Sequence, residues 1–129
     1  ELKENKRIIY QNDDFIVFTP FASRSSFEMR VFPKKHNPNF EEISDKERAG
    51  LAGSLQTVLS KLSKGLGDPD YNMFFHTAPT DYENFEHYHW HIEIVPKTSI
   101  WAGFEIGTGI DISTIAPETA AEFLKEVKI

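Results

Sequence analysis

The segment His87 to Pro96 alternates imidazole or carboxylate side chains with large apolar ones at every second position. Successive side chains of a β-strand point to opposite faces, so this period of two predicts a strand with two chemically different faces. The face directed toward a core would carry Tyr88, Trp90, Ile92 and Ile94. The other face would carry His87, His89, His91 and Glu93. Because three of the five histidines share one face, the segment predicts a metal site or a phosphate-transfer site.

Length and charge narrow the class of protein. With 129 residues, of which 40% are hydrophobic, the chain is expected to form a single domain over residues 1–129. The formal net charge is -6 and the basic residues are scattered, which argues against a nucleic-acid groove. Small anionic substrates remain compatible with this composition.

The sequence contains no cysteine, which excludes disulfides, thiolate ligands and cysteine nucleophiles. Any metal would therefore be bound by nitrogen and oxygen atoms. No long apolar run or signal peptide is present, which predicts a cytoplasmic protein that does not cross a membrane. Because the chain begins at Glu1 rather than at a methionine, we expect either a processed start or a piece of a longer polypeptide.

Local patterns predict the remaining elements. Four further strands are expected at residues 7–10, 15–19, 27–32 and 71–76. Ser44 and Glu47 form a capping box, which predicts a helix whose buried stripe is Leu51, Leu55, Val58, Leu59 and Leu62. A second helix should begin at Pro117 and bury Ala120, Ala121, Phe123, Leu124 and Val127. The glycine-rich residues 103–109 predict a loop. Short connections between the strands favour an α+β fold, an antiparallel sheet with two helices.

An ordered set of short motifs covers nearly the whole chain. It comprises Asp14 to Arg24, Phe27-Glu28 with Pro33 to His36, Asp68 to Asn72, Phe75 to Pro79, His89 to Ile94, Ala102 to Gly109, and Pro117 to Ala121. In this set the chain resembles the C-terminal half of galactose-1-phosphate uridylyltransferases, a branch of the histidine-triad superfamily that includes related sugar-nucleotide phosphorylases. The resemblance implies a histidine-triad-like sheet and an N-terminal partner half that supplies the histidine nucleophile.

The resemblance also implies a metal site. Its ligands in this chain would be His76, His91 and Glu93, with a further glutamate from the N-terminal half, and the ion would be zinc or iron(II). Some relatives have a third histidine where this chain has Glu93, and a carboxylate is also a suitable ligand. His87 and His89 would lie around this site or on the surface without binding the ion.

The same resemblance implies that Gly103, Phe104 and Glu105 contact the hexose of a sugar phosphate across a homodimer interface. The family's usual Ile-Asn-Pro is replaced here by Ile112-Ser113-Thr114, which leaves the conformation of that loop and the sugar preference open. The implied reaction is a double displacement. A histidine takes the uridylyl group of UDP-glucose and then passes it to galactose 1-phosphate.

Three alternatives remain at this point. The chain could be a stand-alone histidine-triad nucleotide hydrolase with His91 as the nucleophile, although Glu93 would repel a phosphate at the position of the usual third histidine. It could be half of a sugar-nucleotide phosphorylase. It could also be a metal-stabilised dimerisation domain that has no activity of its own.

Overall fold

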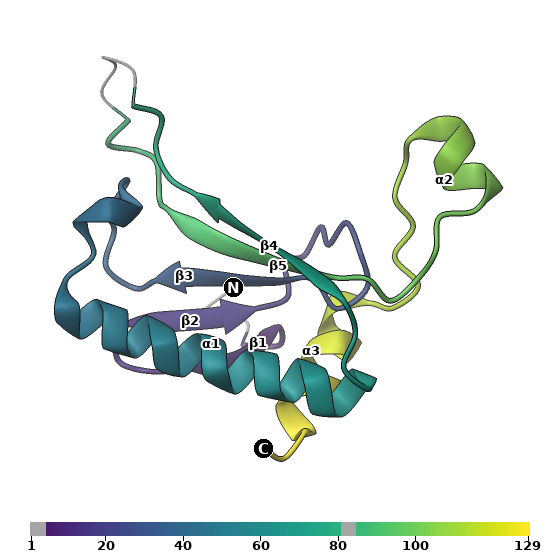
Figure 1. Cartoon of the computed structure of the whole chain (residues 1–129), viewed down its shortest axis with the longest axis horizontal. Helices are drawn as coiled ribbons and strands as arrows, with labels where there is room; N and C mark the ends of the chain where they lie inside the picture. Colours follow the sequence, from purple (N-terminus) through teal and green to yellow (C-terminus); the bar gives the residue numbers. More distant parts are fainter. Residues whose placement is uncertain (1–4, 81–84) are drawn as a thin grey trace.

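The computed structural model describes residues 5–80 and 85–129, which form one antiparallel sheet flanked by helices (Figure 1). The five strands lie in the order β1-β2-β3-β5-β4, so β1 and β4 are the edges. The elements are β1 (Ile8–Gln11), β2 (Phe15–Phe18), β3 (Met29–Pro33), the short 3-10 helix η1 (Phe40–Glu42), α1 (Asp45–Leu66), β4 (Tyr71–His76), β5 (His91–Pro96), α2 (Gly103–Thr108) and α3 (Pro117–Glu126). The predicted α+β class is confirmed.

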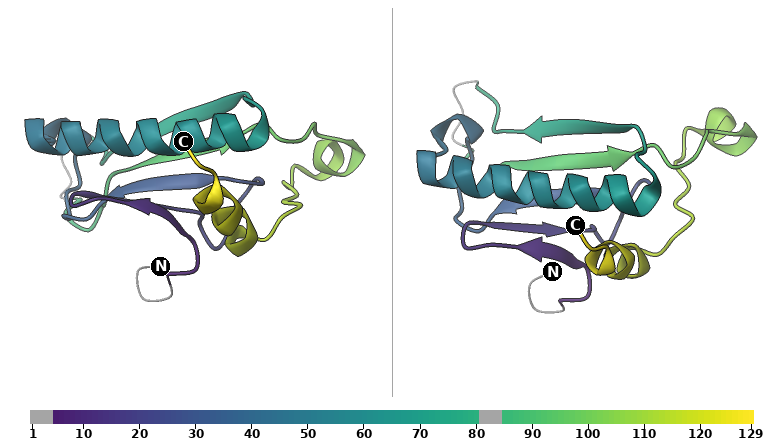
Figure 2. Two further views of the ribbon diagram at one scale, coloured as in Figure 1. Left: turned by 90° about the horizontal axis from the view of Figure 1, so that it is seen from below. Right: turned by 60° about the horizontal axis from the view of Figure 1, so that its bottom comes forward.

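The core lies between the sheet and α1, which runs along one face of the sheet beside α3 (Figure 2). The sheet contributes fully buried side chains to this core at alternate positions of β2, β3 and β5, among them Phe15, Val17, Met29, Val31, Ile92 and Ile94. The helices contribute Leu51, Val58, Leu62, Ala121 and Leu124. Trp90 is also buried, so the predicted apolar face is confirmed from Trp90 to Ile94, whereas Tyr88 is only partly buried.

The helix α1 begins at the predicted capping box and ends at Gly67. The Ser44 hydroxyl accepts a hydrogen bond from the Glu47 backbone N–H at 3.3 Å, and the Glu47 carboxylate accepts one from the Ser44 N–H at 2.9 Å. The Ser44 hydroxyl also donates to the Glu47 carboxylate at 2.5 Å, and this bond, together with the one from the Ser44 backbone N–H, lowers the pKa of Glu47. At the other end, Gly67 adopts a φ of 74°, and its N–H donates to the Ser63 carbonyl. A glycine suits this left-handed position because it has no Cβ.

Two predicted strands are shorter than expected. The strand β5 begins at His91, because the preceding residues bond to loops: the Trp90 N–H donates to the Asn37 carbonyl, and the Tyr88 N–H to that of Phe85. The strand β3 begins at Met29, because Phe27 has a φ of 64° and leaves the extended conformation. In both cases the alternation of side chains extends beyond the residues whose backbones pair with a neighbouring strand. Side-chain alternation alone does not show where that pairing begins.

The predicted loop at residues 103–109 is wrong, because residues 103–108 form the short helix α2. The Glu105 carboxylate accepts a hydrogen bond from the Ala102 N–H at 3.2 Å and closes the first turn. In that segment only Gly109 has a positive φ, of 69°. Residues 97–116 form an arm that carries α2 away from the body of the domain (Figure 1). Within residues 5–80 and 85–129, every helix is too short or too polar to cross a membrane.

Candidate metal centre

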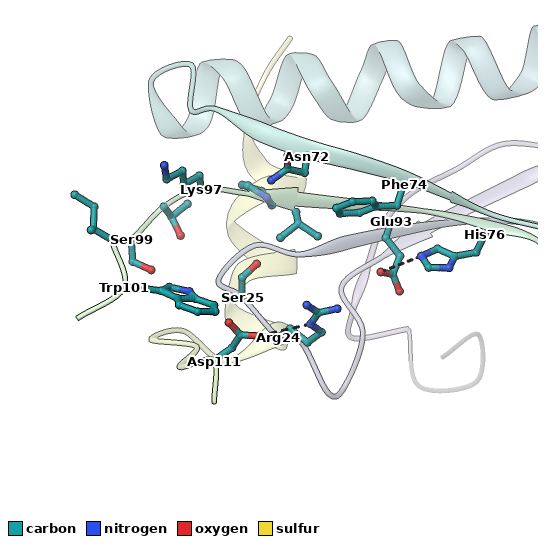
Figure 3. Close-up of a pocket in the computed structure, with 14 residues that line it drawn as sticks. Arg24, Ser25, Asn72, Phe74, His76, Glu93, Lys97, Ser99, Trp101 and Asp111 are labelled. Atoms are coloured by element: carbon teal, nitrogen blue, oxygen red, sulfur yellow. Dashed lines mark ion pairs between the residues drawn. The ribbon is translucent and has the colours of Figure 1, made fainter. Parts of the chain in front are cut away.

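Three predicted side chains converge where β4 and β5 pair. The register places His76 directly opposite His91, and Glu93 lies two residues farther along β5 on the same face. One ligand atom from each of the three residues lies within 4.8 Å of the other two. The Nε2 atom of His76 is 3.3 Å from Oε2 of Glu93 (Figure 3), and Nε2 of His91 is 3.7 Å from Oε1. This geometry can hold one ion.

Ring stacking fixes the planes of the two imidazoles. Phe32 on β3 stacks on His91 with ring centroids 4.6 Å apart and planes 8° apart. His91 in turn stacks on His76 at 4.7 Å and 11°. The three rings come from three neighbouring strands, so the stack exists only because β3, β5 and β4 pair in this register.

The hydrogen bond at the far side of the His91 ring suits metal binding. Its Nδ1 atom lies 3.1 Å from the His89 carbonyl, a partner to which only a protonated nitrogen can donate. The Nε2 lone pair is then left for an ion, as in most histidine metal ligands. Burial lowers the pKa of His91, against the opposing effect of the His89 carbonyl, and so favours the neutral imidazole that binds metals.

The residues around this point also suit a cation. Within residues 5–80 and 85–129 the buried Nε2 atom of His76 has no hydrogen-bond partner, because its approach to the Glu93 carboxylate lies outside hydrogen-bond geometry. Glu93 is 8% exposed and is held by Arg30 at 2.9 Å. Two imidazole nitrogens and one carboxylate oxygen form a donor set that zinc and iron(II) accept. Among the described residues this group has three members, one fewer than a tetrahedral ion needs.

The other two histidines of the pattern differ from each other. His89 is half-buried, makes edge contacts with the rings of Phe32 at 5.3 Å and His36 at 5.0 Å, and orients His91 through its carbonyl. His87 is exposed and its ring lies beside that of Phe85. Neither joins the triad of His76, His91 and Glu93.

The predicted substrate residues lie elsewhere. Gly103, Phe104 and Glu105 form the first turn of α2 on the arm, where Phe104 is 53% exposed and Glu105 caps its own helix. The structure does not bring them to the triad.

A pocket with a volume of about 760 Å³ extends from the triad toward the base of the arm (Figure 3). His76 and Glu93 lie at one end, and Trp101 lies at the other, on the arm. The remaining lining includes Arg24, Asn72, Phe74, Lys97 and Asp111.

Sequence patterns assigned no role at the site to Arg30, which pairs with Glu93, or to Glu28, which pairs with Arg30. Arg30 stands two positions before Phe32 in an alternating segment, and this was the only signal available. The pairing of Arg30 with Glu93 across β3 and β5 requires the strand register.

Comparison with protein families gives one match over residues 1–128, to the family described as galactose-1-phosphate uridyl transferase, C-terminal domain. Among curated proteins, an ADP-glucose phosphorylase from Arabidopsis thaliana is 36% identical over 131 residues, which is 100% of this chain and 37% of that protein. A galactose-1-phosphate uridylyltransferase from Thermotoga maritima is 32% identical over 138 residues, covering 100% of this chain and 43% of that protein. The chain therefore spans less than half the length of these relatives.

Solved structures agree with this assignment of fold. A crystal structure of an ADP-glucose phosphorylase from Arabidopsis thaliana with bound ADP-glucose superimposes with a TM-score of 0.90 at 35% identity, covering 99% of this chain and 42% of that chain. A Hit-like protein from Bartonella henselae superimposes with a TM-score of 0.67 at 18% identity, covering 95% and 86%. The second likeness extends the fold to smaller proteins of the histidine-triad type.

Proposed function

Because the chain belongs to the family of galactose-1-phosphate uridyl transferase C-terminal domains, we propose that it is the metal-binding and substrate-positioning half of a UDP-glucose–hexose-1-phosphate uridylyltransferase. The convergence of His76, His91 and Glu93 is the observation that carries this proposal, because these three side chains could hold a metal ion. The nucleophilic histidine would belong to an N-terminal half of the same enzyme. A homodimer in the cytoplasm is part of the proposal.

The ion would be zinc or iron(II), held by the three side chains and by one ligand from the N-terminal half. With four protein ligands an ion keeps no open position, so its contribution would be to join the two halves rather than to activate water. Within this chain, the stack of Phe32, His91 and His76 would keep both imidazoles aligned for the fourth ligand.

The edge strand β4 supports an N-terminal half as the partner. Its outer edge has no neighbour in the five-stranded sheet, and unpaired strand edges are usually covered by another chain segment or domain. Its large apolar side chains are exposed by 39% to 49%, namely Tyr71, Met73, Phe74 and Phe75. Because β4 also carries His76, a domain that covers this edge could bring a ligand to the ion.

The arm supports a second contact, with the other subunit of a homodimer. Exposed apolar side chains are concentrated on it, namely Ile100, Trp101, Phe104, Ile106 and Ile110. Such a concentration on a projecting segment is typical of a surface that is buried on assembly. Phe104 and Glu105 would then reach the hexose in the active site of the partner subunit, and Gly103 would permit close approach.

The direct test is turnover of UDP-glucose with galactose 1-phosphate by the full-length protein, measured as release of glucose 1-phosphate. We expect activity in the full-length protein and none in residues 1–129 alone, since the nucleophile would lie in the other half. Activity of the isolated chain, shown free of full-length enzyme, would contradict the proposal. Hydrolysis of a nucleoside phosphoramidate by the isolated chain, abolished by His91→Ala, would instead support the stand-alone hydrolase.

A phosphorylase is the second candidate, because the relative with 36% identity is named ADP-glucose phosphorylase. In that reaction inorganic phosphate would replace the sugar phosphate as acceptor. Incubating the full-length protein with UDP-glucose or ADP-glucose, and with either inorganic phosphate or galactose 1-phosphate, separates the two candidates. Turnover that depends on inorganic phosphate would favour the phosphorylase.

A further inference from the structure

A partly buried ion-pair network adjoins the triad through Glu93. Arg30 on β3 is paired in register with Glu93 on β5, and its guanidinium is 2.9 Å from Oε1 of Glu93. The same guanidinium donates to Oε1 of Glu28 through Nε at 3.3 Å and a terminal nitrogen at 3.2 Å. Arg30 therefore joins two carboxylates.

Glu28 is held from both sides. Its side chain is fully buried, and its second oxygen accepts a hydrogen bond from the Arg24 backbone N–H at 2.6 Å. A carboxylate in such surroundings is stabilised only when it is paired and hydrogen-bonded. It is consequently a fixed anchor for Arg30, whose own position is thereby restricted.

The network leaves one carboxylate oxygen of Glu93 for an ion. Oε1 is paired with Arg30 and lies 3.7 Å from Nε2 of His91, whereas Oε2 lies 3.3 Å from Nε2 of His76, which has no hydrogen-bond partner among the described residues. The formal charges of Glu28, Arg30 and Glu93 sum to -1, which a bound cation would offset. Turning Glu93 to present both oxygens to an ion would lengthen its 2.9 Å ion pair with Arg30, so the pair favours presentation of Oε2 alone.

We propose that Arg30, anchored by Glu28, is a positioning residue that restricts Glu93 to one-oxygen coordination and thereby makes the site selective for zinc over manganese. This inference rests on the metal site proposed above. Two imidazoles and a single carboxylate oxygen suit a four-coordinate zinc ion, whereas manganese prefers more oxygen ligands, which a two-oxygen Glu93 would supply.

The decisive variant is the double substitution Glu28→Gln with Arg30→Met in the full-length protein. It removes one negative and one positive charge, so the net charge near the ion is unchanged and any effect reports on positioning. Zinc and manganese affinities are measured by competition with a chromophoric chelator, and the coordination by the visible absorption of the cobalt(II)-substituted protein. We expect zinc affinity to fall about 10- to 100-fold, as for other groups that orient metal ligands. The preference over manganese should fall with it.

Two further variants complete the design. Arg30→Lys keeps the charge but loses the fork, so it should give an intermediate zinc affinity. Arg48→Met removes an exposed arginine that pairs with Asp45 on α1, and it should leave both affinities unchanged. Thermal melting of the metal-free proteins shows whether each variant is folded, and an unfolded double variant leaves Arg30→Lys as the test.

The outcomes distinguish the two proposals. A wild-type protein that binds zinc, with unchanged zinc-to-manganese preference and cobalt spectrum in folded Arg30 variants, would overturn the role of Arg30 alone. A wild-type protein that binds neither ion would overturn the proposed metal site together with this inference.

Discussion

The two faces of the sheet are stabilised in different ways. On the face beneath α1, side chains such as Val17, Val31 and Ile94 are fully buried, and non-directional apolar contact stabilises them. On the opposite face, Arg30, Glu93 and the stacked rings of the triad depend on directional ion pairs and on strand register. The same strands therefore carry apolar packing on one face and the candidate metal ligands on the other.

Truncating the helix-covered face should give the largest effect. Phe15 is fully buried and packs against Trp90 with ring centroids 5.9 Å apart. We expect Phe15→Ala to lower the free energy of unfolding of this domain by about 3 to 5 kcal/mol, through lost burial and the cavity left behind. Urea unfolding measures the change. The matched control Phe104→Ala, on the exposed arm, should change it by less than about 0.5 kcal/mol. Equal losses of unfolding free energy in the two variants would contradict the claim that the helix-covered face stabilises the domain more than the arm does.

On the face that carries the triad, a substitution should lower the affinity for zinc. His91→Ala removes a proposed nitrogen ligand and the centre of the ring stack, so we expect zinc affinity to fall by more than about 100-fold, equivalent to about 2.7 kcal/mol. Elemental analysis after dialysis of the full-length protein checks this. His87→Ala is the matched control, because His87 is exposed and outside the triad, and it should retain the ion. Loss of zinc from both variants would place the site elsewhere.

A substitution on the arm should give a smaller effect, on kcat/KM, that does not depend on either face of the sheet. Glu105→Gln keeps the acceptor that closes the first turn of α2 but removes the charge, and glutamine is also found at this capping position. If Glu105 accepts hydrogen bonds from the hexose, kcat/KM for hexose phosphate should fall by about 10- to 100-fold, because charge-assisted bonds contribute about 1.5 to 3 kcal/mol.

The control for this prediction is Glu122→Gln, an exposed carboxylate on α3. Neither substitution should shift the melting temperature. An unchanged kcat/KM in Glu105→Gln, or a clear loss of stability, would assign Glu105 to the scaffold of α2.

The smallest effect concerns the helix cap that positions α1 over the core face. Ser44→Ala should lower the free energy of unfolding by about 1 kcal/mol. The pKa of Glu47 is lowered in the folded state, so the stability from its charge is present above its ordinary value of 4.5 and is lost as the pH falls through the lowered value. The stability difference between wild type and Glu47→Gln should therefore shrink in acid. A difference that is constant from neutral to strongly acidic pH would contradict this assignment.

Most of the helix-covered face could be predicted from the sequence, because its signals are local. The capping box at Ser44 and the alternation from Trp90 to Ile94 each involve residues near one another in the chain, and the structure confirms both. The predictions failed where distant segments decided the conformation. Residues 87–90 have the alternation of a strand, but their backbone bonds to Asn37 and Phe85 instead of a neighbouring strand.

At the candidate site, too, some features follow from local sequence and others from contacts between distant segments. The sequence by itself placed His91 and Glu93 on one face of a strand, since side-chain alternation depends only on the backbone. The resemblance added His76, and the structure brings it opposite His91. Only the tertiary structure decided which groups surround them. Phe32, Arg30 and Glu28 meet the triad because β3 pairs with β5 in one register, and a shift by a single residue would turn these side chains to the other face.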